Sequence, residues 1–289
     1  MEQILVNGLY MGAQYALIAL GLTLIFSLMN VLNFAHGQMY VFGGFVTYTV
    51  VSQFGLPFIV GLIASAMALA LIGAMIEKFL FRPVIRKSTR EESTMLLAAG
   101  IAFFLDAVIL LIFGEKQRGV PKIIDGVFNW DFRIIMPYDR ILIGCLAIAM
   151  IAGFILFMQY SKSGRAMRAL AQDRVAAQLM GVEVDRYSML GFALGAMLAG
   201  LVGGLLVTIT GINLGMGGPT SIKAFMMIMI GGAGVISGAI AGGFILGMME
   251  SVGLTLLAAY GDITYLIIFA SLMLFLAIRP QGLMGKPWG

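Results

Sequence analysis

The chain has 289 residues, of which 61% are hydrophobic and 11% are charged, and its formal net charge is +4. Soluble domains carry about 25% charged residues, so this composition excludes an ordinary soluble domain and favours a membrane protein. The single cysteine, Cys145, excludes an internal disulfide and a cysteine-based metal cluster.

The N-terminal quarter predicts several membrane-spanning helices. No Asp, Glu, Lys or Arg occurs between Gln3 and Ile76. Because about 20 apolar residues cross a hydrocarbon core about 30 Å thick, the apolar runs at 3–29, 37–53 and 57–77 each predict a span. We therefore expect an all-α polytopic membrane protein.

A polar break separates the first two runs. It contains Asn30, Asn33, His36 and Gln38, and irregular backbone at membrane depth is tolerated only where protein or a water-filled cavity satisfies it. One interpretation is that these side chains cap backbone groups freed by the interruption. The other is that they line the path of a zwitterionic solute, and the two roles can coexist.

The next apolar run, 94–113, carries a carboxylate near its centre. Asp106 lies within LLAAGIAFFLDAVILLIFG, and an ionisable residue at this depth costs about 2.5–3.5 kcal/mol on insertion scales. Such a residue is a functional candidate by default. We favour a structural or gating role for Asp106 over direct contact with a solute.

Hydrophilic segments orient the spans. Those at 77–92 and 161–187 are rich in Lys and Arg, so both are expected on the cytoplasmic side. The spans at 94–113 and 141–160 lie between them, which places the mixed-charge segment 115–140 on the opposite side. This topology accounts for the basic excess without a nucleic-acid partner.

The segment 161–187 is long and polar, and its pattern predicts short helices. Ser163 is expected to cap the first helix, whose first turns carry Arg165 and Arg168. A second helix is predicted to follow it directly.

That second helix is predicted from Arg174 to Met180. Asp173 is expected to cap its start, and Gly181 is expected to end it in the left-handed conformation. Its small apolar face consists of Ala176, Ala177, Leu179 and Met180. Because a helix this short is marginal alone, the face lies either on the bilayer surface or in a groove of a cytoplasmic partner.

The C-terminal part continues the pattern. Apolar runs occur at 188–210, 222–249 and 262–278, with glycine-rich breaks at 211–220 and 231–238. The whole chain therefore predicts about eight transmembrane helices, or eight to ten if the breaks are re-entrant. One break is expected to add a crossing, because the basic C-terminal end is expected on the cytoplasmic side.

The glycines of this region predict close helix packing. Gly234, Gly238 and Gly242 recur every four residues, which makes a smooth ridge on a helix. Glu250 ends the same run, and its structural and functional interpretations stay open. The chain has no GxxxxGK[ST] phosphate loop and no metal-ligand spacing, so we expect no catalytic residue, metal or ATP site in it.

Motifs along the chain point to a family. The string Gly21-Leu-Thr-Leu-Ile-Phe-Ser-Leu-Met-Asn30 is followed by Asn33-Phe-Ala-His-Gly37, then by Asp173 with Ala176-Ala177 and Met180-Gly181, by Gly231-Gly-Ala-Gly234, by Glu250 and by Arg279-Pro280-Gln-Gly-Leu283. In this order they resemble the branched-chain amino-acid ABC transporter permease family, in its shorter, LivH-like membrane subunit. Asp106 departs from the family pattern, which more often has a neutral polar residue there.

The resemblance implies one transmembrane permease domain over residues 1–289, with a coupling segment at 161–187 that seats in an ATPase subunit. It implies translocation of branched-chain or other hydrophobic amino acids across the cytoplasmic membrane. It also implies a second permease subunit, as a heterodimer or homodimer, two cytoplasmic ATPase subunits that bind ATP and Mg, and a periplasmic or surface binding protein.

Site roles follow as expectations. ATPase coupling is expected of Arg165, Arg168, Asp173, Ala176, Ala177, Met180 and Gly181. The translocation path is expected to involve Asn30, Asn33, His36, Gln38, Asp106 and Glu250.

Other functions remain open at this point. Relatives that carry urea or short amides share the pattern, and an ATP-independent secondary transporter is the alternative from another class. The latter more often shows charged coupling-ion sites in several spans, whereas the candidates here are His36, Asp106, Glu250 and Asp262. An intramembrane enzyme is disfavoured, because no nucleophile–base or metal motif is present.

Overall fold

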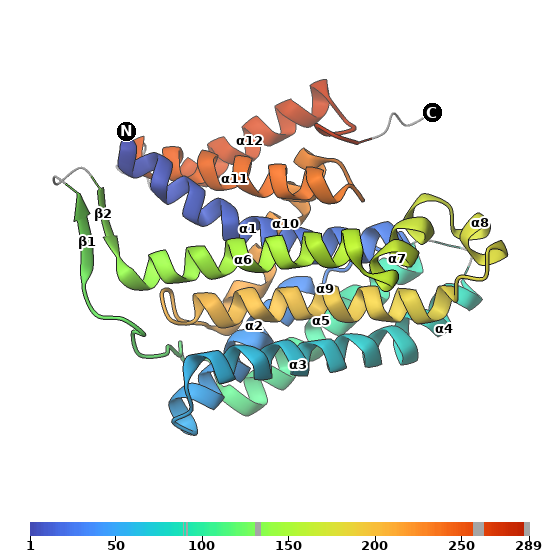
Figure 1. Ribbon diagram of the computed structural model, residues 1–289, viewed down its shortest axis with the longest axis horizontal. Coiled ribbons are helices and arrows are strands. Elements are labelled where there is room, and N and C mark those ends of the chain that lie inside the picture. The colour runs from blue at the N-terminus through green and yellow to red at the C-terminus, as the bar shows by residue number, and fades with distance from the viewer. Residues whose placement is uncertain (89, 91, 131–133, 257–262, 286–289) are drawn as a thin grey trace. The chain divides into compact units, whose positions relative to one another are not determined.

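The computed structural model describes residues 1–88, 90, 92–130, 134–256 and 263–285, so Asp262 lies outside the described residues. Figure 1 labels the helices and strands of the chain, which divides into two compact units by its contacts. The first unit comprises Met1–Thr23, Lys122–Ile151 and Lys223–Gly289, and the second comprises Leu24–Pro121 and Ala152–Ile222.

Long apolar helices dominate the fold, as the sequence predicts. The helices of the apolar runs are α1 (Glu2–Met29), α2 (His36–Tyr48), α3 (Phe58–Ile76), α5 (Glu92–Phe113), α6 (Tyr138–Tyr160), α9 (Val184–Leu206), α10 (Gly217–Gly231), α11 (Ile236–Leu256) and α12 (Ile263–Ile278). The π-helical turn η1 (Thr49–Gln53) continues α2, and the 3-10 turn η3 (Leu214–Met216) precedes α10.

Six helical segments of the described chain are long and apolar enough to cross a membrane. One of them, Phe58–Lys87, joins α3, the π-helical turn η2 (Glu77–Phe81) and α4 (Arg82–Lys87) into a continuous helix. The shorter helices α2, α10 and α12 fill the remaining apolar runs. The predicted fold class is thus confirmed, and the expected count of eight spans is approximate.

The break predicted at 231–238 is present and splits the run 222–249 into α10 and α11. Gly232 and Gly234 have φ angles of +106° and +80°, a region that side chains with a Cβ rarely adopt. This break adds a helix, so α9 to α12 follow the second basic segment, and the prediction that a break adds a membrane crossing stays a prediction.

An antiparallel hairpin lies in the segment 115–140, where the sequence analysis expected only a hydrophilic connection. Strand β1 (Val127–Trp130) pairs with β2 (Ile134–Pro137), with Val127 opposite Pro137. Buried Asp139 supports the approach to the hairpin, because its Oδ1 accepts hydrogen bonds from the backbone N–H groups of Ile123 and Ile124, at 3.1 and 2.8 Å.

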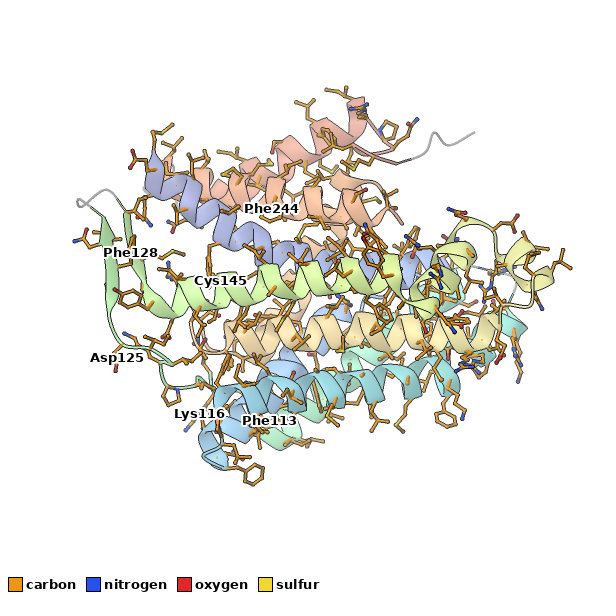
Figure 2. All side chains as sticks on the ribbon, viewed as in Figure 1. Phe113, Lys116, Asp125, Phe128, Cys145 and Phe244 are labelled. Atoms are coloured by element: carbon orange, nitrogen blue, oxygen red, sulfur yellow. The ribbon has the colours of Figure 1, made fainter. Side chains whose placement is uncertain are left out.

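The core of the second unit is a close-packed set of helices in which α9 contacts both α2 and α3 extensively. The Ser65 hydroxyl of α3 donates to the carbonyl of Gly200 on α9 at 2.9 Å. Phe113, labelled at the end of α5 in Figure 2, stacks on Phe45 of α2 with ring centroids 4.4 Å apart. These contacts hold α2, which carries polar residues predicted to line the path.

Candidate functional site

The polar break between α1 and α2 is irregular backbone stabilised by its own side chains. Asn30 ends α1 with a φ of +53°, and its N–H donates to Phe26 O at 2.8 Å. Asn33 is buried, and its Oδ1 accepts from the N–H of Ala35 at 3.1 Å. His36 is also buried and begins α2. The capping interpretation therefore applies to Asn33, whose side chain accepts a hydrogen bond from a backbone N–H of the break.

Ser221, which the sequence analysis did not select, connects this break to the start of α10. Its Oγ accepts from the N–H of Gly37 at 2.9 Å and donates to the carbonyl of Phe34 at 3.0 Å. A Cβ on Gly37 would overlap the carbonyl of Gly217, so only glycine permits this approach. The position of Ser221 directly after the glycine-rich break 211–220 is the signal that was available in the sequence.

Gln38 and Asp106 are brought together from α2 and α5. Gln38 Nε2 lies 3.5 Å from Asp106 Oδ2, a long hydrogen bond. Gln38 Oε1 and Asp106 Oδ1 are both buried, and neither has a hydrogen-bond partner within the described part of the chain. Since buried polar atoms are nearly always paired, these two acceptors on neighbouring side chains are a candidate contact for a solute donor.

Glu250 belongs to a different cluster, in the first unit. It is buried on α11, and its Oε1 accepts from Lys223 Nζ of α10 at 2.7 Å. Its other oxygen accepts from the hydroxyl of Tyr15 on α1, and Lys223 Nζ also donates to that hydroxyl at 2.8 Å. The ion pair with Lys223 explains the charge of Glu250 at this depth.

Lys223 is the partner of Glu250, and the sequence analysis did not select it. It is the only Lys or Arg between Arg186 and Arg279. A lone basic residue in so long an apolar stretch, with a lone Glu near the end of that stretch, is the signal that predicts such an interior pair.

The coupling segment forms the two expected helices, α7 (Lys162–Gln172) and α8 (Arg174–Leu179). The predicted cap at Ser163 is wrong: Ser161 is the N-cap, and its side chain accepts from the N–H of Gly164 at 2.8 Å. Arg165 is exposed, and Arg168, also exposed, donates to the carbonyl of Gln159 at 3.3 Å.

The caps of α8 are as predicted. Asp173 Oδ1 accepts from the N–H groups of Val175 and Ala176, both at 2.9 Å. Gly181 ends the helix with a φ of +84°. These contacts fix a six-residue helix that would be marginal alone.

The apolar surface that α8 presents differs in part from the predicted face. Ala177 is buried against its own chain, so its place on an open docking face is a wrong prediction. Ala176 is exposed, and Val175, Leu179 and Met180 are exposed by 69%, 83% and 85%. Val175 was not among the predicted residues. The open apolar face of this helix is therefore Val175, Ala176, Leu179 and Met180.

The start of α9, directly after this segment, is fastened to the end of the helix Phe58–Lys87. Arg82 pairs with buried Glu77 at 3.1 and 2.5 Å and donates to the carbonyl of Asp185 at 3.0 Å. The Asp185 carboxylate forms an ion pair with Arg86. These contacts connect the start of α9 to the helix Phe58–Lys87.

The glycine ridge is helical in only two of its three predicted members. Gly238 and Gly242 lie on α11, where a Cβ would overlap the backbone of Gly231 and of Met227 on α10. Gly234 precedes α11 in the positive-φ loop, so its place on the ridge is a wrong prediction.

The sequence of this chain is similar to those of known membrane permeases. Residues 4–276 match the family described as the permease component of the branched-chain amino acid transport system. The chain is 33% identical to the BraD permease protein of a high-affinity branched-chain amino acid transport system in Pseudomonas aeruginosa, covering 99% of this chain and 96% of that protein. It is 31% identical to the LivH permease protein of Salmonella typhimurium, covering 97% and 94%. It is 30% identical to a probable LivH protein of Methanocaldococcus jannaschii, covering 94% and 89%.

A solved structure shares the fold. PsaBC from Streptococcus pneumoniae, in complex with a Fab, superposes with a TM-score of 0.50 at 14% identity, covering 94% of this chain and 90% of that chain. At this identity the likeness concerns the fold alone.

Proposed function

This chain belongs to the branched-chain amino acid transport permease family, and from that membership we propose which solute it moves and with which subunits. It is a permease subunit of an ABC importer in the inner membrane, and its role is transport. The proposed solutes are branched-chain or other hydrophobic amino acids. The observation that carries this proposal is the identity of about a third to BraD over nearly the full length of both chains.

The proposed assembly contains subunits that supply what this chain lacks. Two cytoplasmic ATPase subunits would bind ATP and Mg and hydrolyse the nucleotide, and a second permease subunit would complete the path. A periplasmic or surface binding protein would deliver the solute. The exposed apolar face of α8 supports the ATPase contact, because Leu179 and Met180 are almost fully solvated in this chain alone and burying them would be favourable.

The proposed solute contact in this chain is the pair Gln38 and Asp106, which replaces the structural or gating role that the sequence favours for Asp106. An amino acid is a zwitterion, and its ammonium group is a donor only, with no acceptor. Such a group would satisfy the two buried acceptors, Gln38 Oε1 and Asp106 Oδ1, that have no partner within the described residues. A charge-assisted hydrogen bond to the carboxylate is stronger than a neutral one, which would compensate for the burial of Asp106.

The ATP-independent secondary transporter is not favoured. Its expected signature is a set of charged coupling-ion sites in several spans, whereas Glu250 is neutralised by Lys223. Family membership points the same way.

Uptake by the complete importer, measured against a panel of amino acids, urea and short amides, tests the substrate proposal. We expect leucine, isoleucine and valine to compete with one another and urea and acetamide to compete with none of them. Competition by urea or acetamide alone would contradict the proposal.

A further inference from the structure

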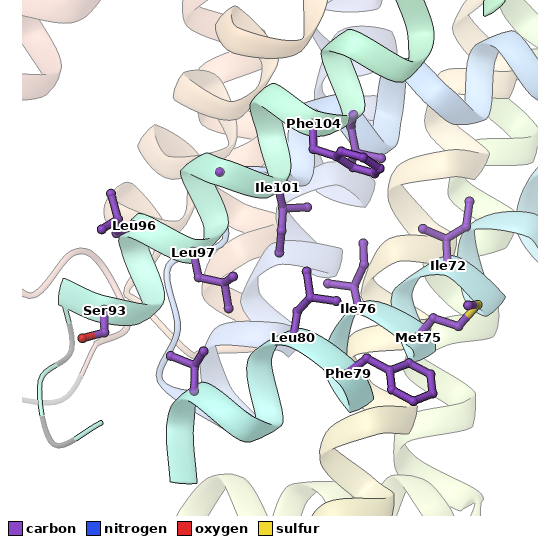
Figure 3. Close-up of a pocket in the computed structure, with 13 residues that line it drawn as sticks. Ile72, Met75, Ile76, Phe79, Leu80, Ser93, Leu96, Leu97, Ile101 and Phe104 are labelled. Carbon is purple, nitrogen blue, oxygen red and sulfur yellow. The ribbon is translucent and has the colours of Figure 1, made fainter. Parts of the chain in front are cut away.

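An apolar groove opens between the helix Phe58–Lys87 and α5 in the second unit (Figure 3). Its volume is about 920 Å³, near the upper end of the roughly 300–1,000 Å³ typical of small-molecule sites. Figure 3 shows Leu97 and Ile101 of α5 pointing toward Leu80 and Ile76 across the space. Among the described residues that line it, only Ser93 has a polar side chain.

The groove has a buried floor and an open rim. Ile76, Ile101 and Leu105 are buried, whereas Phe79, Leu96 and Phe104 are exposed by 61%, 76% and 65%. Large exposed apolar side chains along a trough of this length indicate contact with something apolar. The described residues place no side chain of this chain over it.

A polar pocket of about 380 Å³ adjoins one end of the groove. Arg90, Glu92, Ser93 and Leu96 line it, and Ser93 and Leu96 also belong to the groove wall. Ser93 is held in place by a hydrogen bond from the Ser88 hydroxyl at 2.8 Å. Arg90 and Glu92 are both exposed, and neither forms a salt bridge with another residue that the structure describes. Among the residues that the structure describes, the cavity is therefore an apolar trough with Arg90 and Glu92 as the charged side chains at its mouth.

The mouth lies at the depth of a lipid headgroup. Helix α5 has 22 residues and is about 33 Å long at 1.5 Å per residue, close to the hydrocarbon thickness of about 30 Å. Arg90 and Glu92 stand at its N-terminal end, in the basic segment that the positive-inside rule assigns to the cytoplasmic side. The apolar trough runs from this end toward the centre of the span.

We propose that this cavity binds one aminophospholipid of the phosphatidylethanolamine type. One acyl chain lies in the trough between α5 and the helix Phe58–Lys87. The phosphate is bound by the Arg90 guanidinium, which matches phosphate oxygens with paired N–H donors. The headgroup ammonium donates to the Glu92 carboxylate.

The charges at the mouth select this occupant over others. A purely anionic headgroup would use Arg90 but would be repelled by Glu92, and a choline headgroup has no N–H to donate. A helix from another subunit would cover the trough, but its apolar surface would not form a hydrogen bond with either Arg90 or Glu92 at the mouth. Purely basic pockets between transmembrane helices on the cytoplasmic side bind anionic lipids, whereas the mouth here pairs Arg90 with Glu92.

Gly100 offers a direct test of the trough. It lines the groove, and a Cβ added there meets no atom within 4 Å, so Gly100→Phe adds a large side chain to the groove from an unhindered position. Gly153 on α6 is the matched control, because its added Cβ also meets nothing within 4 Å and it does not line the groove. Arg90→Gln and Glu92→Gln test the mouth.

The measurement is native mass spectrometry of the full-length chain in its importer, titrated with phosphatidylethanolamine, phosphatidylcholine or phosphatidylglycerol. We expect the parent to retain phosphatidylethanolamine in preference to the other two. Gly100→Phe should reduce its binding about tenfold and Gly153→Phe should not change it. Arg90→Gln should weaken binding about tenfold, the value of one charge-assisted hydrogen bond, and Glu92→Gln should remove the preference over phosphatidylcholine.

Several results would overturn the proposal. One is unchanged lipid binding by Gly100→Phe. Another is that the parent protein binds phosphatidylglycerol in preference to phosphatidylethanolamine, which would show that Glu92 does not bind a headgroup ammonium. The third is loss of a second permease subunit from Gly100→Phe with lipid binding intact, which would make the groove a protein interface.

Discussion

At the scale of single residues, the protonation state of Asp106 distinguishes a structural role from solute binding for the buried acceptors of Gln38 and Asp106. A protonated Asp106 would be a neutral donor and would need no ammonium, whereas an ionised one needs a cation or several donors. Asn is isosteric with the protonated acid, so one substitution separates the two cases.

We expect Asp106→Asn to lower amino-acid uptake by the reconstituted importer about 10- to 100-fold, the value of one hydrogen bond to a charged group. The loss should appear mainly in the KM. Asp125→Asn, in the connection before β1 and exposed, serves as the control and should transport normally. Uptake by Asp106→Asn at the parent level would show that the carboxyl is protonated and structural.

The Lys223–Glu250 pair gives a second prediction at this scale. Glu250→Leu leaves Lys223 without its carboxylate, and breaking a buried pair costs about 3–5 kcal/mol. Lys223→Met in the same chain removes the stranded charge and should recover most of the loss. Thermal unfolding of the purified single and double variants measures both.

The double variant also separates stability from transport. A folded Glu250→Leu, Lys223→Met chain that transports normally would confirm a purely structural pair. A folded double variant without transport would return Glu250 to the translocation path.

At the scale of elements, α8 is the helix on which the proposed ATPase contact depends. Because Ala177 is buried in this chain, a charge there would unfold the segment and would test nothing about docking. Leu179→Asp with Met180→Asp places two charges on the open face instead, where burial in a groove would be costly. We expect this variant to insert and fold normally and to lose co-purification with the ATPase.

The control variant for the α8 experiment adds the same two negative charges to the neighbouring helix α7. Ala171→Asp with Gln172→Asp changes exposed residues at the end of α7 and should keep the ATPase bound. Retention of the ATPase by the Leu179, Met180 variant would place the docking surface elsewhere.

The contact between α10 and α11 yields a further prediction. Gly238→Leu must separate the two backbones, because even a Cβ there overlaps Gly231, and overpacking costs about 1–3 kcal/mol. Gly153→Leu, in open space on α6, should leave the thermal midpoint unchanged. An unchanged midpoint for Gly238→Leu would mean that α10 and α11 are not in close contact.

The elements differ in how far the sequence predicts them. The bilayer fixes the length and polarity of a span, so the apolar runs predict α1, α5, α6 and α9 closely. Asp173 and Gly181 are predicted because caps are local chemistry. Both Ser161 and Ser163 are suitable N-cap residues for α7. The structure uses Ser161, whose side chain accepts a hydrogen bond from the N–H of Gly164.

Other features depend on contacts between distant segments, which local patterns do not contain. Ser221 is selected by the backbone of Gly37 and Phe34, far away in the sequence. Ala177 is apolar like its neighbours, and only packing decides that it is buried while Leu179 is open. The pairing of Lys223 with Glu250 likewise joins two helices.

At the scale of the whole molecule, the chain has the features of a membrane permease subunit. It has helices that cross the membrane, a capped cytoplasmic helix with an open apolar face, and no phosphate-binding loop in its sequence. Contacts of Arg82 and Arg86 with Asp185 connect the start of α9, which follows α8, to the helix Phe58–Lys87. Family membership agrees with a permease role, and the supply of energy by ATPase subunits stays a proposal.

Uptake of labelled leucine into proteoliposomes that contain the complete importer and its binding protein tests this account most directly. We predict uptake only when the ATPase subunits are present and ATP is supplied on their side, and none from an ion gradient alone. Leucine uptake that persists without ATP and follows a proton or sodium gradient would contradict the account.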